Sequence, residues 1–237
     1  MKAAFLVAPG VVLGDLTPAH LMLSMIPGAE VHTVWKTKDV LFADFGAFPI
    51  LATTTFDECP ADLDVLFAPM VGPEVHGDRE TIDFLADRGR HARWVMSVCG
   101  GALMLGVAGL LEGYRTATHW LYDELITRCG AMISPERVVV DRNRITSDGG
   151  SAAIEHALVM ARHLVGEAFA KEMELLFEWD PQPQLAFGVG SPEKAGPELT
   201  ERVRHNMSPT LASLRDCVEI SIAERQRELV AAPRDVG

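Results

Sequence analysis

Short apolar runs alternate with helical segments along this chain, and that alternation restricts the fold more than any other feature of the sequence. Parallel strands joined through helices form a sheet that is covered on both faces. The sequence therefore predicts an α/β fold, a three-layer sandwich with a mostly parallel central sheet. Strands are predicted at 3–8, 30–35, 63–69 and 94–98. Helices are predicted at 17–25, 81–89, 100–109, 121–128 and 151–164.

The chain is predicted to hold one main domain at 1–197 and a helical C-terminal extension and tail at 198–237. Its 237 residues fit one α/β domain with extensions. The stretch 180–197 is rich in Pro and Gly, so we expect a loop there. Residues 199–230 have helical periodicity and many Arg and Glu side chains, which predicts one or two surface helices. The tail at 231–237 is expected to fray.

Charge and apolar content narrow the location and the partners that we expect. The net charge is −12, so nucleic acid and anionic membranes are predicted to be repelled. The apolar start ends at Pro9-Gly10, too early for a secretory signal, and no apolar run reaches the roughly 18 residues of a membrane span. The four cysteines form no C-x-x-C pair and no cluster with histidine, so we expect no metal site and no disulfide framework. A reducing cytoplasm is the predicted setting.

One cysteine directly follows a predicted strand and precedes a predicted helix. The strand 94–98 runs into Cys99, which is followed by Gly100 and Gly101. Glycines beside such a turn let the backbone fold sharply and leave the side chain exposed. The start of a helix also favours a thiolate over a thiol. We therefore predict that Cys99 is a nucleophile with a lowered pKa and is the most reactive of the four thiols. The alternative is a small buried structural residue.

Asp15 is the candidate partner of Cys99. It follows the turn after the first strand and precedes a helix that is expected to begin with Thr17 as its N-cap. The first strand of a parallel sheet is usually central, and ligands bind at the carboxyl ends of strands. Asp15 is therefore expected on the same edge of the sheet as Cys99. An aspartate here can equally well stabilise the helix dipole, and position alone does not separate the two roles.

The segment around the nucleophile resembles the ThiJ/PfpI superfamily. The likeness rests on residues 97–120, in which Cys99 stands between a strand and two glycines, and it continues along the chain to about Pro197. Within the superfamily, the sequence is most similar to the isonitrile hydratases, also called cyclohexyl-isocyanide hydratases. Further segments that carry the likeness are 15–17, 27–31, 35–36, 55–60, 63–66, 141–146, 154–158 and 180–183.

The resemblance implies a flavodoxin-like fold, usually assembled as a homodimer, with no metal and no organic cofactor. It implies that Cys99 is the nucleophile and that Asp15 supplies the carboxyl group. The implied reaction adds water to an isonitrile and gives an N-substituted formamide. A protonated Asp15 would give its proton to the isonitrile carbon, the Cys99 thiolate would attack to form a thioimidate, and Asp15 would then activate water. Backbone N–H groups of Gly100 and the loop 70–72 would hold the developing charge.

Three departures from the hydratase pattern lie at or near the expected pocket. Gly100 stands where the hydratases usually have Thr, whose hydroxyl serves the active site. Met70 and Val71 stand where they usually have two glycines, and Gly72 follows. The late helix starts with Ser151-Ala-Ala-Ile-Glu155 in place of a Thr-Ala-Gly-Ile-Asp run. The first two departures touch the pocket itself, so the identity of the substrate is less well supported than the fold.

Two histidines and several rival functions stay open. His119 is a candidate substrate-binding residue, and His76 follows Gly72 at a position that could overhang the pocket, so its role stays open. A glyoxalase-like hydratase of α-oxoaldehydes would use the same cysteine and carboxyl group. A ligand-sensing or inactive member is the other alternative. A DNA-binding regulator would need a basic region of roughly 100 residues after the domain, and the short acidic extension lacks both the room and the charge.

Overall fold

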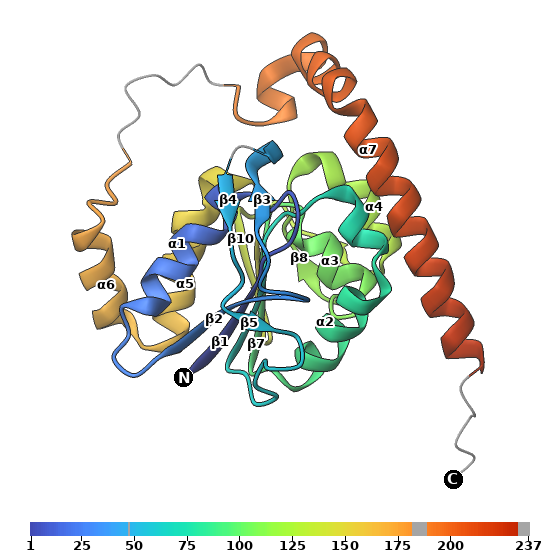
Figure 1. Ribbon diagram of the computed structural model, residues 1–237. Helices are drawn as coiled ribbons and strands as arrows, with labels where there is room; N and C mark the ends of the chain where they lie inside the picture. Colours follow the sequence, from blue (N-terminus) through green and yellow to red (C-terminus); the bar gives the residue numbers. More distant parts are fainter. Residues whose placement is uncertain (47, 182–188, 232–237) are drawn as a thin grey trace.

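A seven-stranded sheet with the strand order β10-β11-β7-β6-β1-β2-β5 forms the centre of the molecule (Figure 1). The computed structural model describes residues 1–46, 48–181 and 189–231. Neighbouring strands of this sheet are parallel except for the hairpin pair β10 and β11. The strands are β1 (Lys2–Leu6), β2 (Glu30–Trp35), β5 (Thr54–Thr55), β6 (Val65–Ala68), β7 (Trp94–Val98), β10 (Val138–Asp141) and β11 (Arg144–Ser147).

Helices cover both faces of this sheet (Figure 1). Helices α1, α5 and α6 lie on one face, and α2, α3, α4 and α7 lie on the other. The predicted flavodoxin-like three-layer sandwich is therefore confirmed. The helices are α1 (Leu13–Ser24), α2 (Arg79–His91), α3 (Gly101–Val107), α4 (Asp123–Arg128), α5 (Ala153–Leu164), α6 (Glu167–Leu176) and α7 (Pro192–Ala231). Two small sheets stand outside the main one, formed by β3 (Leu41–Ala43) with β4 (Phe48–Ile50) and by β8 (Arg115–Thr116) with β9 (Met132–Ile133).

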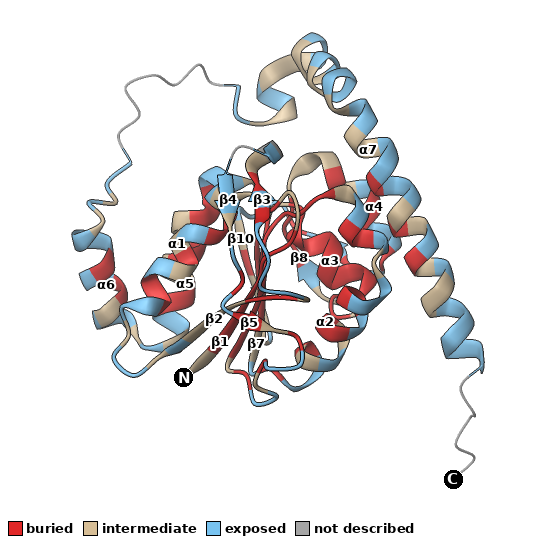
Figure 2. Cartoon of the chain, in the orientation of Figure 1, coloured by how far each residue is buried: buried red, intermediate tan, exposed pale blue. Residues whose placement is uncertain are grey.

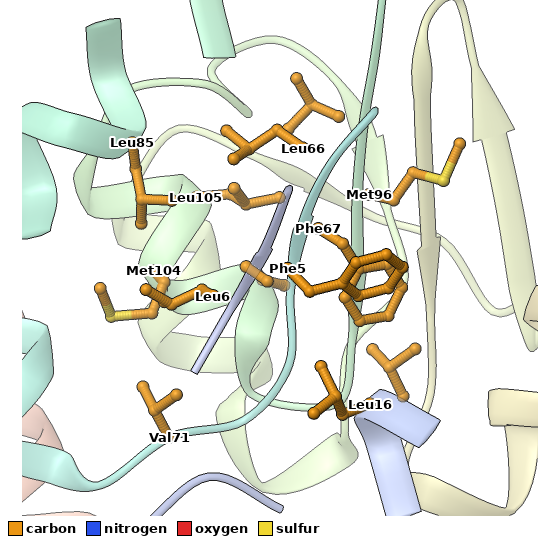
Figure 3. Packing of buried hydrophobic residues seen from close by; sticks show 14 of the residues in the cluster. Phe5, Leu6, Leu16, Leu66, Phe67, Val71, Leu85, Met96, Met104 and Leu105 are labelled. Carbon is orange, nitrogen blue, oxygen red and sulfur yellow. The ribbon is translucent and has the colours of Figure 1, made fainter. Parts of the chain in front are cut away.

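The middle strands β1, β6 and β7 are almost entirely buried (Figure 2). Phe5 of β1 and Phe67 of β6 lie side by side, with ring centroids 4.9 Å apart. Leu and Met side chains surround this pair (Figure 3). Aromatic residues make up only 7% of the chain, so the core depends on Ala, Val, Leu and Met. Burial on both faces explains why these strands read as continuous apolar runs.

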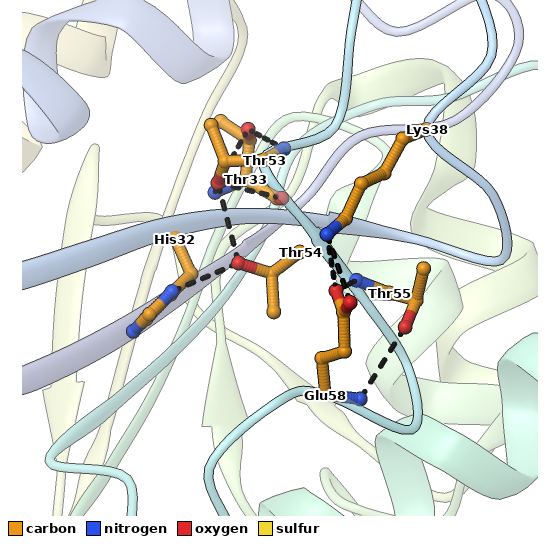
Figure 4. Close-up of polar contacts among 7 residues, drawn as sticks. All are labelled: His32, Thr33, Lys38, Thr53, Thr54, Thr55 and Glu58. Carbon is orange, nitrogen blue, oxygen red and sulfur yellow. Dashed lines mark hydrogen bonds and ion pairs between the residues drawn. The ribbon is translucent and has the colours of Figure 1, made fainter.

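Strand β5 closes one edge of the sheet and is held by polar contacts (Figure 4). His32 Nδ1 lies 2.9 Å from Thr54 Oγ1. The carboxylate of Glu58 accepts the N–H of Thr55 and forms an ion pair with Lys38. These contacts pair the polar groups of an edge strand that is only two residues long. Three strands separate this edge from β7, which leads to Cys99.

Helix α1 begins earlier than the sequence pattern predicted. Thr17 is not its N-cap; the helix starts at Leu13. The N–H of Leu13 donates to Asp44 Oδ1 at 2.9 Å, so a side chain from the β3–β4 hairpin caps the helix. The hydroxyl of Thr17 donates to the carbonyl oxygen of Leu13 instead. Asp15 consequently lies inside the first turn of α1 and not before it.

Helix α7 is longer than predicted and packs on the domain. It begins at Pro192, within the stretch that was expected to be a loop, and is interrupted at Gly196, where φ is 76°. Leu214 and Val218 of α7 are fully buried, and the helix contacts α3 and the short 3-10 helix η2 (Pro73–Gly77). The C-terminal segment therefore forms a surface helix, as predicted, and buries one row of its side chains against the domain.

Part of the predicted loop, at 182–188, lies outside the described residues. The division of the chain at residue 197 into a domain and an extension stays a prediction. No helix in the described ranges combines the length and the apolar content that crossing a membrane requires.

Candidate active site

Cys99 occupies the turn between β7 and α3 and has a backbone conformation that is uncommon outside glycine. Its φ is 58°, in the left-handed region. Its N–H lies 3.1 Å from the carbonyl oxygen of Ser147 and 3.0 Å from that of Asp148. Its own carbonyl oxygen accepts a hydrogen bond from Thr118 Oγ1 at 2.7 Å. A backbone held in this conformation is typical of a nucleophile at a sharp strand-to-helix turn. The predicted turn is therefore present.

The two glycines after Cys99 allow this turn to lie close to its neighbours, each for a different reason. A Cβ atom on Gly101 would lie 1.9 Å from the carbonyl oxygen of Ala68, so the approach of α3 to strand β6 requires glycine. A Cβ atom on Gly100 would lie 2.2 Å from Sδ of Met70 and 3.0 Å from the ring of Tyr122. The Met70 thioether thus fills the space that a larger residue at Gly100 would need.

Asp15 is completely buried in the first turn of α1 and lies beside Cys99. Its Oδ2 accepts the N–H of Met70 at 3.3 Å. Its Oδ1 has no hydrogen-bond partner among the described residues, and a Cβ atom on Gly150 would lie only 3.2 Å from it. The Cys99 thiol is near enough for each group to shift the pKa of the other. The structure thus brings the two predicted catalytic residues together.

Burial dominates the electrostatics of this pair. It raises the pKa of Asp15 to about 7, although the N–H of Met70 and the Cys99 thiol act in the opposite direction. Burial also raises the pKa of the Cys99 thiol, and the charge of Asp15 adds to this effect, while the N–H of Gly100 opposes it. The predicted lowering of the Cys99 pKa is therefore wrong. The start of the seven-residue helix α3 does not outweigh burial and a neighbouring carboxylate. The resting pair is a neutral thiol beside a carboxyl group that titrates near neutral pH.

The loop 70–72 borders the pair, but two of its N–H groups are already paired. The N–H of Met70 donates to Asp15, and the N–H of Gly72 donates to the carbonyl oxygen of Pro9 at 2.9 Å. The sequence had led us to expect that N–H groups of this loop hold the developing charge. The N–H groups of Met70 and Gly72 are not free to do so. They hold the loop against Asp15 in α1 and against Pro9, which follows strand β1.

The two residues that replace the usual glycines of this loop lie in different surroundings. Val71 is fully buried and packs in the hydrophobic core (Figure 3). Met70 is also buried, and its Sδ lies directly over Gly100, the residue after the nucleophile. Of these two residues, which were both expected to line the pocket, only Met70 adds bulk against Gly100 and the turn that carries Cys99.

One aromatic side chain lies beside the turn that carries Cys99, and a second packs against the first. Tyr122, which the sequence analysis did not single out, is almost completely buried. Burial raises the pKa of its phenol, and the charges of Cys99 and Asp15 raise it further. His119, a predicted substrate-binding residue, lies beside Tyr122 with ring centroids 5.6 Å apart. Burial lowers the pKa of His119, so its imidazole is neutral at neutral pH. The phenol of Tyr122 therefore lies near the pair, and the neutral imidazole of His119 packs against that phenol.

A cavity of about 710 Å³ adjoins this arrangement. It is lined by Thr118 and Asp148, which hold the backbone of Cys99, and by His119. Arg204 of α7 also lines it. Cys99 and Asp15 do not line the cavity, but it is the candidate substrate site because Thr118 and Asp148 in its wall bond to the backbone of Cys99.

His76 is completely buried at the end of η2. Its Nδ1 lies 3.2 Å from the carbonyl oxygen of Gly72, and burial lowers its pKa to about 4. His76 therefore does not overhang the pocket, because its side chain is completely buried in the protein. His20 is half-buried and packs edge-on against Phe5, with ring centroids 5.4 Å apart.

The remaining cysteines form no second centre within the described ranges. Cys59 and Cys129 are buried, and Cys217 is half-buried on α7. Burial is the main cause that raises the pKa of each of these thiols. No group of three or more His, Cys, Asp or Glu side chains among the described residues is arranged to hold a metal ion.

Known proteins with this combination of sequence and fold include an enzyme. An isonitrile hydratase from Pseudomonas putida is 37% identical over 227 residues, which cover 94% of this chain and 97% of that protein. The crystal structure of a ThiJ/PfpI family protein from Pseudomonas syringae matches with a TM-score of 0.85 and 36% identity, covering 92% of this chain and 90% of that one.

Transcription regulators share part of the same domain. The HTH-type transcriptional regulator GbdR of Pseudomonas aeruginosa is 34% identical over 160 residues, which are 64% of this chain and 41% of the regulator. The same fold thus carries different functions, so the function has to be argued from the site. The model of the DJ-1/PfpI family matches residues 1–163, which contain the nucleophile turn, Asp15 and the whole central sheet. The chain belongs to the DJ-1/PfpI family.

Proposed function

We propose that this protein is an isonitrile hydratase, which adds water to an isonitrile and releases an N-substituted formamide. The observation that carries the proposal is the buried pair of Cys99 and Asp15, with an unpaired carboxyl oxygen beside a thiol in a strained turn. The similarity to the P. putida isonitrile hydratase over nearly the whole of both chains supports the same reaction class.

The first step places a proton and a sulfur atom on the isonitrile carbon. Asp15 accepts the thiol proton of Cys99 and passes it to this carbon, while Sγ forms a bond to the same atom. The intermediate is a thioimidate, in which the carbon is doubly bonded to nitrogen. Because burial raises the thiol pKa, the proton leaves as the C–S bond forms and not beforehand. A carboxyl group with a pKa of about 7 is suited to taking up and releasing a proton at neutral pH.

The second step adds water to the thioimidate. Asp15 takes a proton from water and delivers it to the nitrogen, while the water oxygen bonds to the carbon. The C–S bond then breaks, and the remaining hydroxyl proton passes through Asp15 to Sγ. An N-substituted formamide leaves, and the Cys99 thiol is restored. One carboxyl group thus acts as base and as acid in both steps.

We also propose that the enzyme acts as a homodimer in the cytoplasm. The β3–β4 hairpin supports an interface, because Phe42 and Phe48 remain more than half exposed, at 54% and 57%, as does Leu51 after it, at 56%. Apolar side chains gathered on one projecting element are typical of a contact surface. Sedimentation of the wild-type protein decides this part of the proposal, since a monomer at micromolar concentration would exclude it.

A panel of isonitriles and methylglyoxal tests the proposed reaction. Wild-type protein is expected to convert at least one isonitrile to its formamide, which mass spectrometry of the product detects, and to leave methylglyoxal unchanged. The Cys99→Ala variant is the control, because it lacks the atom that forms the thioimidate. Conversion of methylglyoxal alone would favour the glyoxalase-like reaction, and conversion of neither would favour a ligand-sensing or inactive member.

Gly100→Thr is expected to improve activity only when Met70 is also replaced by glycine. Threonine would restore a hydroxyl beside the nucleophile, and a missing hydrogen bond of this kind is worth about 1–3 kcal/mol, or roughly one to two powers of ten in rate. The new Cβ atom would lie 2.2 Å from Sδ of Met70, so the single variant must displace that side chain. We expect Gly100→Thr alone to lose stability, and Gly100→Thr with Met70→Gly to turn over a simple alkyl isonitrile about tenfold faster than wild type.

Measurements of kcat/KM and thermal unfolding for the two single variants and the double variant separate these effects. Met70→Gly alone is the matched control, since it opens the space without adding the hydroxyl. Adding Val71→Gly should change little in the rate, because that side chain packs in the core. Equal rates for Met70→Gly and the double variant would show that the hydroxyl has no part in turnover here.

A further inference from the structure

A buried histidine connects helix α7 with the loops that surround the reactive pair. Ser221 of α7 is itself buried, and its hydroxyl donates to the carbonyl oxygen of His76 at 2.8 Å. Nδ1 of the His76 imidazole lies 3.2 Å from the carbonyl oxygen of Gly72. The carbonyl oxygen of Gly100 is also close enough to influence this ring. His76 thus lies between a C-terminal helix and two segments of the active site.

Both of these segments hold a reactive residue in place. Gly100 directly follows Cys99 in the strained turn. Gly72 belongs to the loop whose Met70 N–H donates to Asp15. A displacement of the imidazole would therefore move the nucleophile and the carboxyl group relative to each other. A change far from the reacting atoms that misplaces them by about 1 Å can cost roughly a hundredfold in rate.

The imidazole acts here by its shape and one N–H group and not by its charge. It is completely buried, and burial keeps its pKa near 4, so it is neutral at neutral pH. A neutral imidazole has one N–H donor and one acceptor nitrogen. Nδ1 faces the carbonyl oxygen of Gly72, and Nε2 has no hydrogen-bond partner among the described residues. His76, like Cys99 and Asp15, does not line the candidate substrate cavity.

Helix α7 is held in a defined register over η2. Leu214 and Val218, each completely buried, anchor it on the same side as Ser221. Sγ and Cβ of Cys217 lie so near η2 that a Cβ atom on Gly77 would be 3.5 Å from them. This close packing fixes the Ser221 hydroxyl against the His76 backbone, since neither helix can slide without losing the contact.

We propose that His76 is a positioning residue of the active site and that helix α7 holds it there through Ser221. The C-terminal helix then helps to position the catalytic residues, in addition to packing on the domain. The effect on turnover rests on the proposed isonitrile hydratase reaction, whereas the effect on the reactivity of Cys99 does not.

Ser221→Ala tests the contact with the smallest change. It removes one hydroxyl and leaves the helix intact. We expect kcat for an isonitrile substrate to fall about three- to tenfold with KM little changed, because the reacting groups and not the cavity are displaced. The rate at which iodoacetamide alkylates Cys99, followed by mass spectrometry, should change at least threefold. Ser213→Ala is the matched control, since Ser213 lies exposed on the same helix. Ser221→Thr keeps a hydroxyl and should restore most of both rates.

His76→Gln and His76→Leu extend the test to the imidazole itself. Glutamine retains an N–H donor that can reach Gly72, so we expect it to keep more activity than leucine. Circular dichroism and thermal unfolding establish that each variant is folded, and Ser221→Ala decides the question if the His76 variants are not. Rates of turnover and alkylation within twofold of wild type in folded Ser221→Ala overturn the proposal. A changed alkylation rate in a protein that converts no isonitrile would overturn the proposed reaction and leave the positioning role standing.

Discussion

Replacing Asp15 with asparagine is expected to lower isonitrile turnover by about a thousandfold while the fold survives. Asparagine has nearly the same shape and can still accept the N–H of Met70. It cannot take up or release the proton that both proposed steps route through this position, and general acid–base catalysis is typically worth 10² to 10⁴. Steady-state kinetics on the best substrate of the isonitrile panel measures the loss. A variant with near wild-type turnover would mean that Asp15 serves only the first turn of α1.

The same variant is expected to be more stable than wild type at pH 8. A carboxyl group whose pKa is about 7 in the folded protein and 3.8 in the unfolded chain binds its proton more tightly when folded. Its contribution to stability is therefore complete below pH 4, is lost as the pH rises from about 4 to 7, and stays lost above that. The loss is at most about 4 kcal/mol. Asp15→Asn should remove most of it, so the difference in the free energy of unfolding should grow between pH 4 and pH 7 and then stay constant.

Two further measurements test whether these effects come from the carboxyl group of Asp15. Asp39→Asn changes an exposed carboxyl group and should leave turnover and the pH dependence of unfolding as they are in wild type. Removing the charge of Asp15 should also lower the pKa of Cys99, because that charge raises it. Alkylation of Cys99 at pH 8 should therefore become several-fold faster in Asp15→Asn, although turnover is lost. Slower alkylation would indicate that Asp15 activates the resting thiol as a base.

The framework of the fold and the strand-to-helix turn at Cys99 could be predicted from local sequence patterns. Apolar runs followed by turn signals located the strands of the sheet. A strand that is buried on both faces has apolar residues at consecutive positions, so it can be recognised in the sequence. The strand, Cys99 and two glycines located the sharp turn, because the backbone conformation there depends on neighbours in the sequence. Asp15 was less certain from its position alone, and its closeness to the thiol became visible only in three dimensions.

Long-range contacts explain what the sequence did not reveal. The start of α1 depends on Asp44, which lies 31 residues after the N–H group that it caps. The link from Ser221 to His76 joins residues 145 positions apart. Tyr122 follows the His119-Trp120 pair, but no spacing rule places its ring against Gly100. Contacts of this kind arise from packing between elements that are distant in the chain, so local sequence patterns do not predict them.

The pKa of Cys99 shows how two correct principles can compete. A helix N-terminus stabilises a thiolate by a modest amount at exposed sites. Burial removes the solvation of the same thiolate and acts over the whole side chain. The negative charge of Asp15 acts in the same direction as burial. Sequence alone indicated the helix start but not the depth of burial, so the predicted direction of the pKa shift was wrong. The proposed reaction accordingly moves the thiol proton during bond formation.

Gly101→Ala is expected to destabilise the protein by about 3 kcal/mol or more, far beyond the effect of most surface substitutions. The new Cβ atom would lie 1.9 Å from the carbonyl oxygen of Ala68 and 2.6 Å from its carbonyl carbon, and neither is a flexible side-chain atom. Relief requires that α3 move away from strand β6, which opens the buried core beneath the turn. Because Cys99 lies between β7 and α3, the same movement would disturb the strained backbone of the nucleophile.

Gly14→Ala provides the matched comparison, because both changes add one methyl group to a helical glycine. A Cβ atom on Gly14 meets nothing within 4 Å, and the residue is exposed in α1. Alanine there should be neutral or stabilise the protein by about 0.5–1 kcal/mol, because glycine loses more backbone freedom on folding. Urea unfolding of both variants measures the difference, which should appear as a lower midpoint for Gly101→Ala and an equal or higher one for Gly14→Ala. Similar midpoints for the two would show that α3 tolerates a side chain against β6, and the tight turn would then not be what holds Cys99 in its conformation.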